Sequence, residues 1–127
     1  MPPTRENALQ GTPVIFVGTV RTIEAVHIVD GKVKRGRDRA GSLQNWQAFK
    51  FKVVEALKGV SSSSIIVNSG DEGCRVGFDI GQTYLVYADR YKHQPGFLTT
   101  TYCHRNSNIE RAQDEVKWLR DLLKRAG

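Results

Sequence analysis

The sequence has no long hydrophobic run and no apolar leader segment. Its longest apolar runs, residues 14–17 and 84–88, are far shorter than the ~20 residues that a membrane-spanning helix needs. Residues 1–7 lack the apolar stretch that forms the centre of a secretory signal peptide. We therefore expect no membrane span and no signal segment in this chain.

Motifs of the common catalytic and cofactor sites are also absent. The sequence contains no P-loop, no dinucleotide-binding glycine motif, no HExxH and no GxSxG nucleophile elbow. His27, His93 and His104 stand singly, whereas a metal site usually brings two ligands close together on one element. We therefore expect no enzymatic activity, no cofactor and no metal ion.

Acidic residues are fewer than basic residues, 13 against 19, which gives a net charge of +6. Half of this excess falls in residues 30–42, where five basic and two acidic residues are interspersed with three glycines. We expect a loop here, whose charges either keep it solvated or contact an acidic surface or phosphate groups.

The 127 residues predict one domain, 1–127, because domains cluster near ~100–150 residues. Apolar and β-branched residues predict strands at 14–29, around 49–53, and at 65–67, 84–88 and 97–103. Gly18 lies inside the long first strand and indicates a bend or bulge. Residues 6–10 indicate a single turn, and residues 91–96 indicate a turn between the last two strands.

A helix is predicted to close the chain from Ser107 onward. Ser107 and Glu110 have the spacing of a capping box, in which both side chains satisfy free backbone N–H groups. Glu115 is expected on the polar side. The apolar side is predicted to consist of Ile109, Ala112, Val116, Leu119 and Leu123, widened by Trp118 and Leu122.

The pattern predicts a mainly β domain with one C-terminal helix. It has five expected strands, of which the first is bent, and one helix to cover them. Within this class the pattern favours a five-stranded Greek-key barrel of the OB-fold type. Lipocalin-like and SH3-like barrels are the alternatives.

The segment from Cys74 to Ala88 resembles the netrin-like family that contains the tissue inhibitors of metalloproteinases, particularly its bacterial members. The shared pattern is a cysteine, then Phe78 and Gly81, then the strand Tyr-Leu-Val-Tyr-Ala. Other segments resemble this family in order along the chain: Pro2-Pro3-Thr4 with Ala8-Leu9, residues 16–20, residues 51–59, and residues 98–103 followed by Ile109 and Ala112.

The resemblance implies a role for the two cysteines. In the family, a Cys-x-Cys pair just before the prolines forms disulfides with two downstream cysteines, which Cys74 and Cys103 match. The upstream pair is missing here, so we expect that a processed N-terminal segment carried it. Cys74 and Cys103 would then pair with each other or remain free thiols. The alternative is two unrelated buried cysteines that act as small hydrophobic residues.

The resemblance also implies the function. The inhibitors chelate a protease zinc through an N-terminal cysteine, and this cannot be transferred to a chain that begins with Met1. We expect a monomeric, extracytoplasmic binding module that is secreted, periplasmic or lipid-anchored. Its expected partner is a protein, and proteases are one class of candidate. Three regions that converge in the family predict an interaction rim of Pro2, Pro3, Thr4, Lys34, Arg35, Arg37, Arg39, Cys74 and Arg75.

The alternative function belongs to a different class. An OB fold could bind single-stranded nucleic acid or another anionic polymer through the basic loop at 30–42. Such proteins stack bases on aromatic side chains in a basic groove, and Trp46, Tyr91 and Phe97 are the candidates.

Overall fold

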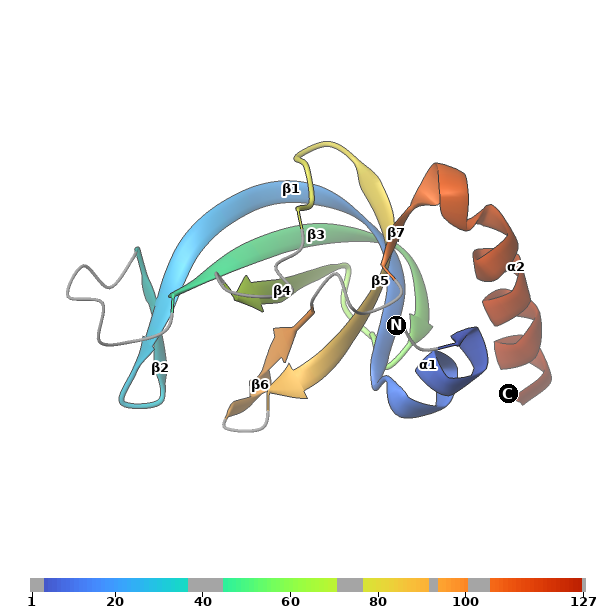
Figure 1. Cartoon of the computed structure of the whole chain (residues 1–127), viewed down its shortest axis with the longest axis horizontal. Helices are drawn as coiled ribbons and strands as arrows, with labels where there is room; N and C mark the ends of the chain where they lie inside the picture. Colours follow the sequence, from blue (N-terminus) through green and yellow to red (C-terminus); the bar gives the residue numbers. More distant parts are fainter. Residues whose placement is uncertain (1–3, 37–44, 71–76, 92–93, 101–105, 127) are drawn as a thin grey trace.

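The computed structural model describes residues 4–36, 45–70, 77–91, 94–100 and 106–126 (Figure 1). The fold is mainly β, with one helix at the C-terminus, as the sequence predicts. The helices are α1 (Arg5–Gly11) and α2 (Ile109–Ala126). The strands are β1 (Val14–Val29), β2 (Lys32–Arg35), β3 (Asn45–Lys58), β4 (Ser64–Gly70), β5 (Thr83–Tyr91), β6 (Gln94–Thr99) and β7 (Ser107–Asn108).

The first strand, β1, is long and bent, as predicted. Its register against β3 shifts between Val17 and Gly18. A Cβ atom at Gly18 would lie 2.7 Å from the Phe16 ring and 3.1 Å from the Cβ of Phe51, so only glycine fits at this bend. The bend lets the first part of β1 pair with β5 and the last part pair with β2.

Five strands form a closed ring of pairings in the order β1–β3–β4–β6–β5–β1. All of these pairings are antiparallel except that between β4 and β6, which is parallel and has one register pair, Asn68 with Thr99. The Asn68 side-chain amide donates to the Leu98 carbonyl at 2.9 Å, and the Asn68 carbonyl accepts from the Thr100 N–H at 2.8 Å. Asn68 therefore closes the ring with both its backbone and its side chain.

The core has one cluster inside the ring, one under the helices and a third around Trp46. Inside, Phe78 packs edge-to-face against Phe49 and Phe51, with ring centroids 5.1 and 5.3 Å apart. Outside, the alternate residues of β1 and β5 are covered by α1 and α2. This outer layer consists of Ala8, Ile15, Val17, Leu85, Tyr87, Ala112, Val116 and Leu119. Both faces of these strand segments are buried, which explains their continuous apolar sequences.

The C-terminal helix has the predicted apolar side but a different start. Asn108 caps α2 by accepting from the Glu110 N–H at 3.0 Å. The Ser107 hydroxyl instead donates to the Asn108 carbonyl at 3.3 Å, so the predicted capping box of Ser107 and Glu110 is wrong. Glu115 is also not on the solvent side, because it accepts a hydrogen bond of 2.5 Å from the hydroxyl of the buried Tyr87.

Several strand boundaries differ from the prediction. Residues 32–35 form β2 rather than loop, because Asp30 and Gly31 both have positive φ and form the two-residue turn typical of a tight hairpin. The turn predicted at 91–96 is shorter, since β5 extends to Tyr91 and β6 begins at Gln94. Residues 6–10 lie in α1, whose first turn is capped by the Thr4 hydroxyl.

Gly59 provides a test of the chain reversal that follows β3. Its φ is +70°, and a Cβ atom would collide with the Pro13 backbone oxygen. We expect Gly59→Ala to lower the free energy of unfolding by roughly 2–4 kcal/mol, because strain and overpacking add. Gly77→Ala is the matched control, since nothing lies near a Cβ there. Chemical denaturation measures both variants, and equal stabilities would contradict the placement of Gly59.

Tyr87 provides a test of how α2 is held on the sheet. Tyr87→Phe removes the hydrogen bond to the Glu115 carboxylate, and we expect a loss of about 1.5–3 kcal/mol. Tyr84→Phe removes a neutral bond, in which the Tyr84 hydroxyl accepts from the Asp79 N–H, and should cost about 0.5–1.5 kcal/mol. Urea unfolding compares the two variants. A larger loss for Tyr84→Phe would contradict this arrangement.

Candidate binding surface

The structure separates the described members of the predicted interaction rim. Thr4 caps α1, beside the start of β1 and near α2, whereas Lys34 and Arg35 lie on β2 at the other end of β1 (Figure 1). The predicted convergence is therefore not present between these residues. The other candidates lie outside the described residues: Pro2, Pro3, Arg37, Arg39, Cys74 and Arg75, together with the disulfide candidate Cys103.

No metal site or membrane helix is found in the described part of the chain. Within it, no group of three histidine, cysteine, aspartate or glutamate side chains is placed to hold a metal ion. Neither helix, over its described residues, is long and apolar enough to cross a membrane. His27 lies on β1, and its Nδ1 donates to the Gly36 carbonyl at 2.8 Å, which fastens the end of β2 to β1.

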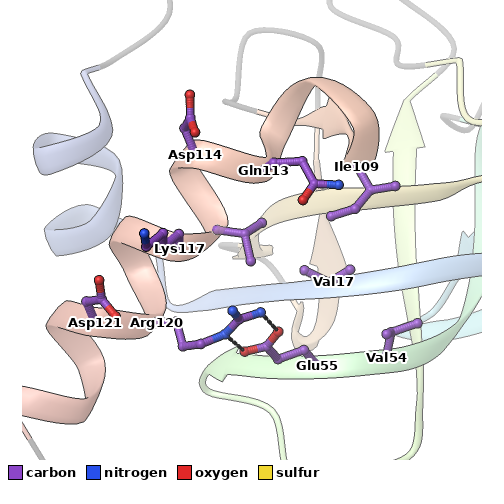
Figure 2. A pocket seen from close by; sticks show the side chains of 10 residues that line it. Val17, Val54, Glu55, Ile109, Gln113, Asp114, Lys117, Arg120 and Asp121 are labelled. Carbon is purple, nitrogen blue, oxygen red and sulfur yellow. Dashed lines mark hydrogen bonds and ion pairs between the residues drawn. The ribbon is translucent and has the colours of Figure 1, made fainter.

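One hollow, of about 530 Å³, lies between α2 and the sheet (Figure 2). Arg120 reaches from α2 to Glu55 on β3 and forms two parallel hydrogen bonds, of 2.8 and 2.6 Å, with its carboxylate. This contact, together with the charge of Glu55, raises the pKa of Arg120 above its usual value. The ion pair therefore joins the helix to β3. We interpret this hollow as part of the packing interface between α2 and the sheet and not as a binding site.

A second hollow, of about 360 Å³, lies beside β2 and has an apolar floor. Val26, Ala48 and Phe97 form the floor and are at least nine-tenths buried. Val33 of β2 and Ile66 of β4 stand on its two sides and are 47% and 52% exposed. Five strands thus place an apolar surface next to the most basic hairpin of the chain.

An aromatic cluster continues the apolar floor of this second hollow. Trp46 packs edge-to-face against Phe97 and Tyr91, with centroids 5.1 and 5.3 Å apart. Trp46 and Phe97 are only 7% and 5% exposed. Trp46 and Phe97 are therefore scaffold residues and not exposed platforms for stacking bases, whereas Tyr91, the third candidate, is half-buried.

Polar side chains on the hollow's rim are partly paired. Arg35 of β2 contacts Glu24 of β1 at 3.1 Å, and both side chains are well exposed. Such surface pairs contribute little to stability. Lys50 is exposed on β3, directly opposite Ile66 on β4. The hollow is therefore an apolar surface bordered by the Arg35–Glu24 pair and by Lys50.

Comparisons with known proteins give no relative. No family model matches the chain, and a search of curated proteins found no match.

Ile66 is a surface residue of the hollow beside β2, whereas Trp46 is a buried residue of the aromatic cluster that continues the hollow's floor. Substitutions at these two positions test this difference. Ile66→Thr keeps a β-branched side chain on a half-exposed position, and we expect it to change the free energy of unfolding by less than ~1 kcal/mol. Trp46→Ala removes the centre of the aromatic cluster and should cost about 3–5 kcal/mol. Thermal and urea unfolding measure both. A large loss for Ile66→Thr would mean that Ile66 belongs to the core.

Proposed function

We propose that this chain is a netrin-like binding module built on a Greek-key barrel of the OB-fold type. The strand order supports this. In the ring, β1, β3 and β4 follow one another, and β5 returns to lie on the other side of β1. This order, with the fourth strand beside the first, is that of a Greek key. The helix α2 packs on the outside of the ring, against β1 and β5.

The binding surface in this proposal is the hollow beside β2. The observation that carries it is the pair of exposed apolar side chains, Val33 and Ile66, above a buried apolar floor. Part of the hollow's lining, Ala48, Ile66 and Asn68, comes from β3 and β4, the second and third strands of the ring. OB folds bind their ligands on that face and on the loops beside it.

A protein partner suits this surface better than nucleic acid. Non-specific binders of single strands stack bases on exposed aromatic rings. Here Trp46 and Phe97 are buried in their own cluster and Tyr91 is half-buried against both, whereas the exposed large side chains of the hollow, Val33 and Ile66, are aliphatic. We therefore propose a protein as the ligand of this surface. The resemblance to the netrin-like family adds that the module is monomeric, lies outside the cytoplasm and performs no catalysis. Proteases are one partner class that the resemblance implies.

Photo-crosslinking from two positions tests this proposal. Ile66 and Val54 are comparably exposed, 52% and 61%, but Ile66 lies in the hollow beside β2 and Val54 beside α2. We expect benzoylphenylalanine at 66, and not at 54, to form a discrete protein adduct in secreted or periplasmic fractions of the source cells.

The adduct should be abolished by excess unlabelled protein but not by excess Ile66→Glu protein. Adducts from position 54 alone would show that the partner binds at the hollow between α2 and the sheet. Adducts that nuclease digests would favour the nucleic-acid alternative. Either result would overturn the proposal.

A further inference from the structure

We infer that the outer edge of β2 pairs with an extended acidic segment of the partner, which adds to the sheet as a further strand beside the hollow. This inference rests on the proposed function and names the chemistry of the partner. It follows from the backbone of β2, from its charge and from the alternation of its side chains.

The backbone of β2 has free groups on its outer side. β2 ends the strand order, and among the described strands only β1 pairs with it. The Gly36 N–H donates to the Ala25 carbonyl at 2.7 Å, which makes this a hydrogen-bonded pair. Hydrogen-bonded pairs alternate in an antiparallel ladder, so Lys34 and Lys32 also face β1. The N–H and C=O groups of Val33 and Arg35 therefore point outward.

The positive charge of β2 favours an acidic strand as the segment that pairs with its outer edge. Lys32, Lys34 and Arg35 are all exposed, and among the described residues the only ion pair they form is that of Arg35 with Glu24. Lysine on an edge strand opposes pairing with a like-charged strand, because like charges directly opposite one another are destabilising. A second copy of β2 is disfavoured for this reason. A strand that carries carboxylates is attracted instead.

The alternation of β2 also predicts a pattern in the partner. Val33 lines the hollow, whereas Lys32 and Lys34 lie on the opposite face of the same strand. A strand added beside β2 would place its alternate side chains on these two faces. The expected segment therefore alternates acidic residues, which meet the lysines, with apolar residues, which cover the exposed Val33 and extend the apolar surface.

A labelled peptide of alternating valine and glutamate tests the charge requirement. We expect fluorescence anisotropy to show binding that Lys32→Glu/Lys34→Glu weakens about tenfold or more, because two attractions become repulsions. Arg111→Glu/Lys117→Glu on α2 is the matched control, since both residues are exposed and the change in charge is equal. If both variants lose affinity for the peptide equally, the loss reflects the net charge of the protein and not the β2 edge. That result would overturn the inference.

The same peptide tests strand pairing directly. N-methylation of its edge-facing amides should abolish binding, and the unmodified peptide should slow hydrogen exchange at the amides of Val33 and Arg35. Unchanged binding of the methylated peptide, or unchanged exchange at both amides, would overturn the inference. If the peptide fails to bind while position 66 still crosslinks to a protein, strand addition is wrong and the proposed function stands. If position 66 forms no adduct, the proposed function fails whatever the peptide does.

Discussion

One strand, β1, takes part in three strand pairings, and the ring, the core and the hollow all depend on it. Its first part lies between β3 and β5 and closes one side of the ring, whereas its last part lies between β3 and β2. A straight strand could not do both. Gly18 lies at a register shift of β1 against β3, where a Cβ atom would come within 2.7 Å of the Phe16 ring. The hairpin that carries Lys32, Lys34 and Arg35 is therefore displaced from the helices by the length of β1.

Much of the fold is predictable from local patterns. The continuous apolar runs at 14–17 and 84–88 are typical of strands buried on both faces, and α2 covers one of those faces here. The alternation around Phe49 and Phe51 gives the correct face of β3. β2 was missed because its lysines resemble a solvated loop, although the adjacent Asp30-Gly31 is a common hairpin signal. Ser107 has the spacing of a capping box, but β7 continues through Asn108, so the helix begins one residue later and the Asn108 side chain caps it.

The candidate surface was much less predictable, because it depends on contacts distant in sequence. Its lining comes from five strands, and no short motif joins Val33, Ala48, Ile66 and Phe97. The described part of the basic segment at 30–42 supplies Val33 and Arg35 to the hollow. The aromatic residues near it were misleading, since aromatic content alone does not distinguish an exposed ring from Trp46, which is enclosed by Phe97 and Tyr91. The separation of Thr4 from β2 likewise depends on the course of β1.

Ring closure at Asn68 has a consequence for the dynamics of the molecule. Among the described residues, β4 and β6 share one register pair, so few of the described backbone hydrogen bonds join these two strands at the seam between them. Segments held in this way open locally at a lower free energy than the rest of a fold. Asn68 and Phe97 lie on opposite sides of this seam, and both line the hollow beside β2. A molecule that fills the hollow therefore bridges the two sides, and its binding is coupled to the suppression of local opening in the ring.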